Sequence, residues 1–172
     1  TAARIIEVVD RIMRQEGETG RGTVGELHVE PNSRNVIPGK VRFSVEFRHP
    51  DTGELDRLDR LFQREVGAIP RSTGAALELK RLFTIPAQAF DPECVGLVRE
   101  ATRKLGLPAR DIVSGAGHDA VYVARTVPTA MILIPCEGGL SHNEAENISP
   151  DDASNGCQTL FETVVMRANR PL

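Results

Sequence analysis

Apolar residues recur at two different spacings in the first part of the chain. Residues 2–16 carry aliphatic side chains every three or four positions, which predicts an amphipathic helix. Residues 24–30 and 40–48 instead contain alternating apolar and polar side chains, a pattern typical of half-buried strands. We expect these two strands to pair in antiparallel fashion, with Arg48 on the polar face of the second.

A second helix and a third strand are expected after this pair. Asp51 stands three positions before Glu54, which is the spacing of a capping box. The stripe of the helix that it starts is Leu55, Leu58, Phe62, Val66 and Ile69. With a further strand within 75–85, residues 1–85 are predicted to form an α+β layer with helices on one face of an antiparallel sheet.

Three more helices are predicted after a linker at 86–92. The Asp91-Pro92 pair is typical of a helix start, and Gly106 ends that helix. A helix is expected over 118–125 and another over 150–169. The inward face of the last helix is predicted to be Cys157, Leu160, Phe161, Val164, Val165 and Ala168.

Two apolar segments between these helices have the character of buried strands. Residues 111–113 form a short one, and residues 129–135 form a continuous apolar run of the kind buried on both faces of an α/β sheet. Residues 86–172 are therefore predicted to form part of a layered α/β domain. The fold class expected for the chain is α+β followed by α/β, in two domains, 1–85 and 86–172.

Charge and composition exclude several classes of function. The net charge of −3 gives no reason to expect binding to nucleic acid or to an anionic membrane. No apolar run approaches the roughly 18 residues that a membrane span requires. The three cysteines form no C-x-x-C pair, and their odd number argues against a disulfide framework, so a reducing, cytoplasmic location is expected.

Two glycine-rich bends carry the chemistry that stands out. Residues 114–120 read Ser-Gly-Ala-Gly-His-Asp-Ala, and residues 138–143 read Gly-Gly-Leu-Ser-His-Asn. Each bend follows a predicted strand, so both are expected at the sheet edge where open α/β sheets bind ligands. Their histidines, His118 and His142, supply proton carriers or metal-binding nitrogens.

Taken one by one, the candidate residues remain open to two interpretations. His142 could be a metal ligand or an ordinary loop histidine, since no H-x-x-H motif surrounds it. His118 could donate to a developing oxyanion or merely begin a helix. Arg48 could clamp a carboxylate in bidentate fashion or be solvated. Asn35 lies in a proline-flanked loop, where asparagine usually serves turn formation.

Four segments taken together resemble a known family. They are Pro31-Asn-Ser-Arg-Asn-Val-Ile-Pro-Gly39, Val45-Glu-Phe-Arg48, Ser114-Gly-Ala-Gly-His-Asp-Ala120, and Gly139-Leu-Ser-His-Asn143 with Glu146. In this order and spacing they resemble the C-terminal part of hydantoinase/carbamoylase-type amidases of the M20 metallopeptidase-like group. That group includes N-carbamoyl-L-amino-acid hydrolases, allantoate amidohydrolases and β-ureidopropionases.

The resemblance implies an architecture and a reaction. Residues 1–85 would be a lid, or dimerisation, domain without its first strand, and 86–172 the C-terminal portion of a catalytic domain that holds two divalent metal ions, zinc or manganese. The parent protein would be a homodimer joined through its lids. It would hydrolyse the carbamoyl C–N bond of a small N-carbamoyl-L-amino acid or a related ureido acid such as allantoate.

The resemblance also implies a role for each candidate residue. His142 matches a metal ligand, and His118 matches a catalytic histidine that also contacts substrate. Arg48 matches the arginine that holds the substrate carboxylate. Asn35 and Gly117 match further substrate-binding positions.

The other metal ligands and the general-base glutamate of the family match no position after Thr1. We therefore expect the fragment itself to be inactive and to bind metal weakly or not at all. Two alternatives stay open: a non-catalytic self-association module and a relative of the M20 aminopeptidases.

Overall fold

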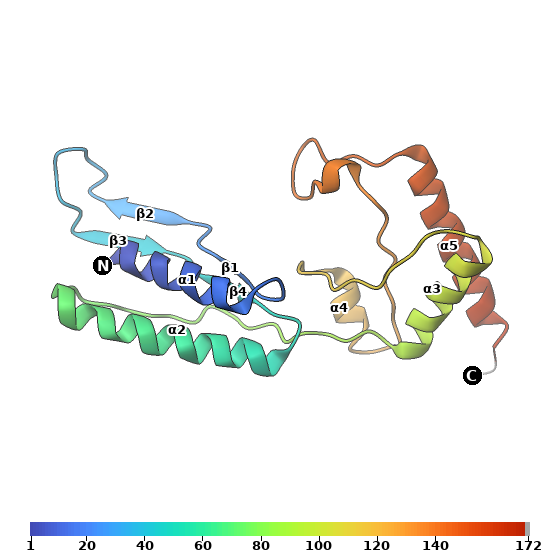
Figure 1. The fold of residues 1–172 in the computed structure, drawn as a ribbon, viewed down its shortest axis with the longest axis horizontal. Coiled ribbons are helices and arrows are strands. Elements are labelled where there is room, and N and C mark those ends of the chain that lie inside the picture. The colour runs from blue at the N-terminus through green and yellow to red at the C-terminus, as the bar shows by residue number, and fades with distance from the viewer. Residues whose placement is uncertain (171–172) are drawn as a thin grey trace. The chain divides into compact units, whose positions relative to one another are not determined.

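The computed structural model describes residues 1–170, which form two compact units, Thr1–Ala87 and Gln88 onward (Figure 1). The first unit contains α1 (Ala2–Glu16), β1 (Arg21–Thr23), β2 (Leu27–Glu30), β3 (Lys40–Phe43), β4 (Glu46–Arg48) and α2 (Thr52–Thr73). The second contains α3 (Pro92–Lys104), α4 (Asp119–Val123), the 3-10 turn η1 (Glu137–Gly139) and α5 (Pro150–Ala168). No helix among the described residues is both long enough and apolar enough to cross a membrane.

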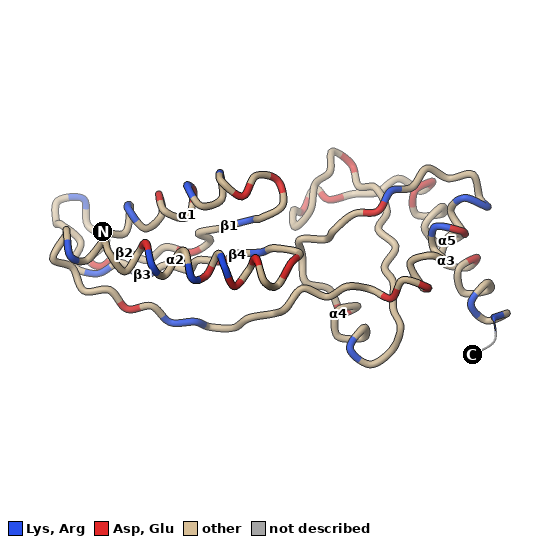
Figure 2. Tube along the Cα trace, turned by 60° about the horizontal axis from the view of Figure 1, so that its bottom comes forward, with Lys and Arg blue, Asp and Glu red and all other residues tan. Residues whose placement is uncertain are grey.

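Both predicted helices of the first unit are confirmed, and their boundaries have local causes. α1 ends at Gly17, whose φ of 68° lies in the left-handed region that glycine adopts without strain. α2 begins after Asp51, whose side chain accepts a hydrogen bond of 3.0 Å from the backbone N–H of Glu54. Basic and acidic residues are interspersed along α2 rather than gathered by sign (Figure 2).

The predicted strand pair is confirmed, but each strand is shorter than expected or divided. β2 pairs with β3 in antiparallel register, with Leu27 opposite Phe43. The second strand is broken after Phe43, and its continuation, β4, pairs with β1, a strand that the sequence pattern did not predict. A Cβ built on Gly22 of β1 would lie 2.5 Å from Cγ of Met13, so this strand passes close against α1.

The core of the first unit lies between the two helices and the strands. Its buried members are Ile5, Val8, Val9, Ile12, Leu58, Phe62 and Val66. Phe47 and Phe62 meet edge to face with ring centroids 5.4 Å apart. Each fully buried aliphatic side chain contributes roughly 1.5–3 kcal/mol. Ion pairs from Arg11 to Glu65 and from Arg57 to Glu16 join α1 to α2 at the rim of this core.

The strand predicted within 75–85 is wrong. This segment has no regular secondary structure, although Leu77 still packs against the core of the first unit. Leu82 and Phe83 are 74% and 71% exposed. A strand exists only through hydrogen bonds to a neighbouring strand, and no described strand pairs with this segment.

The second unit is held together by α3 and α5, both of which were predicted. Leu97 and Ala101 of α3 and Thr159 of α5 are its fully buried residues. Asp91 caps α3 by accepting from the backbone N–H of Cys94 at 2.9 Å, and Ser149 caps α5 in the same way. The Lys104 ammonium lies 2.7 Å from the Glu162 carboxylate, across the two helices.

The α/β sheet predicted for the second unit is not present among the described residues. The segments 111–113 and 129–135 form no strand, and the helix predicted over 118–125 is reduced to α4. The second segment is still hydrogen-bonded to the start of α3, because the carbonyl of residue 129 accepts from the backbone N–H of Asp91 at 3.0 Å. The fold is thus a mixture of helices and two small antiparallel ladders.

The predicted inward face of α5 is also wrong. Leu160, Phe161 and Val164 are 55%, 60% and 56% exposed, and Cys157, Val165 and Ala168 are exposed as well. The face that carries Thr159 packs against α3 instead. The periodicity identified a real apolar stripe, but no described element covers it.

Candidate active site

Arg48 lies on β4, where the strand alternation turns its side chain to the polar face. Its guanidinium binds the carboxylate of Glu46 through Nε and Nη2, both at 2.9 Å. The two residues are neighbours on one face because side chains two positions apart in a strand point the same way. The hydrogen bonds that Arg48 donates to Glu46 raise the pKa of Arg48 above its ordinary value. The arginine is therefore held as a bidentate cation, and Glu46 competes for it with any incoming carboxylate.

Asn35 occupies the loop between β2 and β3. Its side-chain oxygen accepts a hydrogen bond of 2.8 Å from the Ser33 hydroxyl, and the loop is closed by Gly39 N–H donating to the carbonyl of Glu30 at 2.9 Å. Arg48 lies eight residues beyond Lys40, at the other end of the strand path (Figure 1). At 3.3 Å per residue this path is roughly 25 Å long. Asn35 and Arg48 therefore lie at opposite ends of the path through β3 and β4.

His118 is anchored in the loop before α4 by its backbone and by its ring. It is the N-terminal cap of α4 in an extended conformation, and its carbonyl accepts from Val121 N–H at 3.0 Å. Ser114 Oγ lies 2.6 Å from Nε2 of the ring and accepts from the backbone N–H of Ala116 at 3.2 Å. Close by, a Cβ built on Gly117 would meet no described atom within 4 Å.

His142 lies in a closed loop with an unusual backbone. Glu137 N–H donates to the carbonyl of Asn147 at 2.8 Å, which fastens the two ends of the loop together. His142 has φ of 57°, the only positive φ of a non-glycine residue among residues 1–170. Its backbone N–H donates to Glu146 Oε2 at 3.0 Å. Residues with φ above zero cluster at functional sites, where surrounding contacts hold them against the strain.

The described residues do not assemble a metal site around His142. Across residues 1–170 no group of three or more His, Cys, Asp or Glu side chains is close enough to hold an ion. The acidic neighbour Glu146 is used to hold the loop backbone. A structural zinc site requires four ligands, and the exposed His142 would supply one of them.

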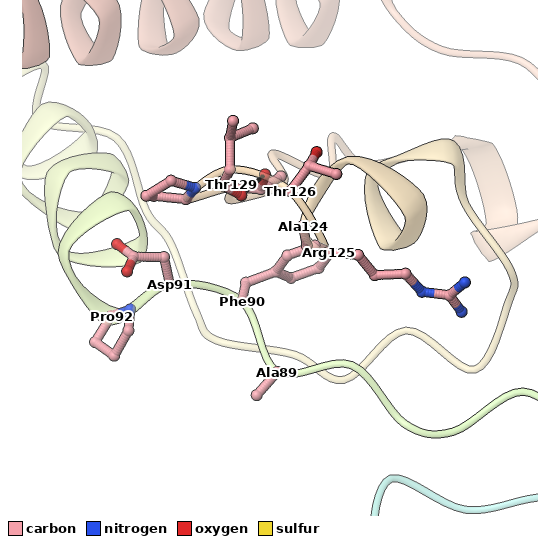
Figure 3. Close-up of a pocket in the computed structure, with 10 residues that line it drawn as sticks. Ala89, Phe90, Asp91, Pro92, Ala124, Arg125, Thr126 and Thr129 are labelled. Carbon is pink, nitrogen blue, oxygen red and sulfur yellow. Dashed lines mark hydrogen bonds between the residues drawn. The ribbon is translucent and has the colours of Figure 1, made fainter.

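An open pocket in the second unit involves none of the predicted site residues. It has a volume of about 510 Å³ and lies between residues 89–92 and residues 124–129. Figure 3 shows the Phe90 ring directed toward Ala124, while the Arg125 side chain points away from the pocket. The Arg125 guanidinium instead stacks over the Tyr122 ring, with its carbon 4.9 Å from the ring centre. The candidate residues therefore remain those named from the sequence, with Asn35 and Arg48 in the first unit and Gly117, His118 and His142 in the second.

Residues 5–166 match the model of Peptidase family M20/M25/M40. The chain belongs to this family. The match extends over both units, so the M20 relationship covers the candidate residues from Asn35 to His142.

Two of the curated relatives that this chain matches are amidohydrolases. The N-carbamoyl-L-amino-acid amidohydrolase of Rhizobium meliloti is 42% identical over 166 residues, which are 96% of this chain and 40% of the relative. The allantoate amidohydrolase of Escherichia coli is 33% identical over 80% of this chain and 34% of its own length. This M20 chain therefore spans about two fifths of the length of such relatives.

Solved structures of other proteins share the fold of this chain. A hydantoinase/carbamoylase family amidase from Burkholderia multivorans superposes with a TM-score of 0.93 at 44% identity, over 99% of this chain and 42% of that one. An aminopeptidase PepT from Bacillus cereus superposes with a TM-score of 0.67 at 16% identity and shows shared fold alone. Both cover most of this M20 chain.

Sequence reasoning missed three partners of the predicted site residues. Glu46 pairs with Arg48, Ser114 contacts His118, and Glu146 holds the backbone of His142. The period of two in the strand could have revealed the first pair. The other two depend on loop conformations that spacing does not determine.

Proposed function

We propose that the full-length protein carrying this chain hydrolyses the carbamoyl C–N bond of an N-carbamoyl-L-amino acid or a related ureido acid such as allantoate. The observation that carries the proposal is the 42% identity to a curated N-carbamoyl-L-amino-acid amidohydrolase over 96% of the chain. The 33% identity to an allantoate amidohydrolase supports a ureido acid as the alternative substrate class. We place the enzyme in the cytoplasm, as expected from its cysteines.

In this proposal the two units have different tasks. Residues 1–85 belong to the lid, or dimerisation, domain and supply Asn35 and Arg48 to the substrate. Residues 86–172 belong to the catalytic domain and supply Gly117, His118 and His142. The full-length protein is a homodimer joined through its lids.

Arg48 recognises the carboxylate of the substrate. A planar guanidinium matches a carboxylate through two parallel hydrogen bonds, and Arg48 already makes this geometry with Glu46. The intramolecular partner holds the fork in a fixed orientation. When substrate binds, its carboxylate replaces the Glu46 carboxylate at Arg48 or shares the guanidinium with it.

His118 serves the carbonyl oxygen of the scissile group as a hydrogen-bond donor. Such a donor is most effective when it is fixed before the reaction begins, and both the backbone and the ring of His118 are held. Gly117 beside it leaves room for a ligand, since no described atom would contact a side chain there. These two residues form the part of the oxygen-binding site that this chain contributes.

The metal requirement that the family implies cannot be met by the described residues alone. His142 supplies one imidazole, and the described residues form no group of three or more potential ligands around it. In the full-length protein a pair of divalent ions, zinc or manganese, would supply Lewis acid and activated water. We expect the 172-residue chain alone to be inactive and to bind metal weakly, because one ligand cannot hold two ions.

Asn35 and Arg48 serve one substrate only if they come from two copies of the lid. They lie at opposite ends of a strand path of roughly 25 Å, which is much longer than a small ureido acid. We propose that the two-fold axis of the homodimer places the Asn35 end of one lid beside the Arg48 end of its partner, as a self-complementary interface allows. The site is therefore completed across the dimer.

The test uses the full-length protein and a matched arginine control. Arg48→Ala should lower kcat/KM for an N-carbamoyl-L-amino acid by roughly 100- to 1000-fold, because a bidentate charge-assisted contact is lost. Arg42→Ala removes an exposed arginine from β3 and should leave kcat/KM within about twofold. Unchanged turnover in Arg48→Ala would contradict the clamp. Hydrolysis of dipeptides instead of ureido acids would favour the aminopeptidase alternative, and a dimer without any hydrolysis would favour the self-association module.

A further inference from the structure

We propose that Ser114 is a positioning residue that fixes the tautomer of His118, so that Nδ1–H is the hydrogen-bond donor of the ring. The inference rests on the proposed function, in which His118 donates to the substrate. It assigns a role to a residue that touches His118 rather than the substrate itself.

The geometry around the Ser114 hydroxyl is the basis of the proposal. Its oxygen lies 2.6 Å from Nε2 of His118 and 3.2 Å from the backbone nitrogen of Ala116. Both side chains are half-buried. The hydroxyl therefore joins the loop backbone to the ring, and it is the one side chain among residues 1–170 that hydrogen-bonds to this ring.

The direction of the contact follows from the inventory of donors and acceptors. A serine hydroxyl has one hydrogen and two acceptor sites. Ala116 N–H occupies one acceptor site, which polarises the hydroxyl and makes it a better donor. The separation of 2.6 Å is shorter than the roughly 2.7–3.2 Å of N–H···O bonds and within the roughly 2.5–3.0 Å of O–H···O bonds, which favours O–H as the donor. Ser114 O–H thus donates to Nε2.

A fixed acceptor at Nε2 determines the rest of the ring. In the neutral imidazole one nitrogen carries the hydrogen and the other accepts, so Nδ1 must carry the hydrogen. Neutral histidine in water favours the opposite tautomer, with the hydrogen on Nε2. Ser114 therefore keeps His118 in the tautomer that is less populated in solution and leaves Nδ1–H as the donor of the ring.

A purely structural role for Ser114 predicts a different tautomer of His118. In that case the hydroxyl would only cap the turn by accepting from Ala116, and the ring would keep its solution preference. The two roles are separated by the tautomer of His118, which is observable directly. Ser114→Thr retains the hydroxyl and therefore serves as the rescue variant for either role.

The test uses the full-length protein with ¹⁵N-labelled histidine, and the His118 signals are assigned through His118→Gln. In the parent protein at a pH where the ring is neutral, the ¹⁵N shifts should show hydrogen on Nδ1. Ser114→Ala should move the hydrogen toward Nε2 and lower kcat/KM for an N-carbamoyl-L-amino acid about tenfold. Ser114→Thr should restore both, to within about threefold in kcat/KM.

Ser154→Ala is the matched control, since it removes the same atoms from an exposed position of α5 in the same unit. It should change neither readout. An unchanged tautomer in Ser114→Ala, or a kcat/KM within twofold of the parent, overturns the inference even if the parent hydrolyses ureido acids. A tautomer that switches in a parent without ureido hydrolysis supports the role of Ser114 and refutes the proposed function.

Discussion

The two units differ in how they treat their apolar surface. In the first unit, seven apolar residues from α1 and α2 are buried together and the strands pack against them. In the second unit, Leu97 and Ala101 are the buried apolar residues, while the stripe of α5 with Leu160, Phe161 and Val164 stays exposed. Both helices α2 and α5 were predicted from the same periodicity, yet only α2 has its stripe covered.

Hydrophobic periodicity therefore indicates which side chains of a helix require burial, but it does not indicate which element covers them. The apolar stripe of α2 is covered by α1 and the strands of its own unit. The apolar segments at 111–113 and 129–135 have the composition of buried strands, but among the described residues they form no ladder. The first unit therefore has a stable core of its own, whereas the second is organised around a single helix pair.

The largest test of this comparison uses one substitution at matched sites. Leu58→Ala should destabilise the first unit by about 2–5 kcal/mol, because a fully buried leucine leaves a cavity. Leu160→Ala should change the 172-residue chain by less than about 0.5 kcal/mol, because that side chain is exposed. Amide hydrogen exchange of each helix measures the two values. Equal costs would remove the distinction between the units.

A second test concerns packing inside the second unit. A Cβ at Gly156 of α5 would lie 2.5 Å from Cγ2 of Ile134, whereas a Cβ at Gly96 of α3 would meet nothing within 4 Å. Gly156→Ala should destabilise this unit by roughly 1–2 kcal/mol, after about 1 kcal/mol of helix propensity is gained. Gly96→Ala should stabilise it by about 0.5–1 kcal/mol. If thermal unfolding showed the same sign for both, α5 would not pack against residue 134.

The smallest expected effects concern the stability of each unit at acid pH, where one carboxylate in each unit can be tested separately. The backbone N–H of Cys94 lowers the pKa of Asp91 in the second unit, and the Arg11 guanidinium lowers the pKa of Glu65 in the first. A lowered pKa means that the stabilisation is complete above the unfolded pKa, about 4, and is lost as the pH falls through the folded value.

Asp91→Asn should therefore reduce the acid-induced loss of protection in α3 while leaving α2 unchanged. Glu65→Gln should do the reverse. Hydrogen exchange measured between pH 5 and pH 2 gives both slopes. An equal response of both helices to either variant would show that the two units do not titrate separately.

The sequence predicted the helices well because their signals are local. Asp51, Asp91 and Ser149 each cap the helix that follows, as their positions indicated. The strand predicted at 129–135 is absent among the described residues, because a strand requires a partner that its own residues do not specify.

The candidate site shows the same division. The family motifs identify Asn35, Arg48, Gly117, His118 and His142 as candidates. Their supporting contacts, such as Ser114 to His118 and Glu146 to the His142 backbone, depend on loop conformation. The left-handed backbone of His142 was likewise invisible in the sequence, since that conformation is uncommon for a non-glycine residue.

We propose that the lid residues of two copies complete one ureido-acid site. Full-length Asn35→Ala and Arg48→Ala are each expected to be nearly inactive as homodimers. When the two are unfolded together and refolded at equal amounts, half of the dimers are mixed, and each mixed dimer holds one site with both residues intact. The account predicts recovery of about a quarter of the parent activity. No recovery from verified mixed dimers would contradict it, because it would place Asn35 and Arg48 of one copy at the same substrate.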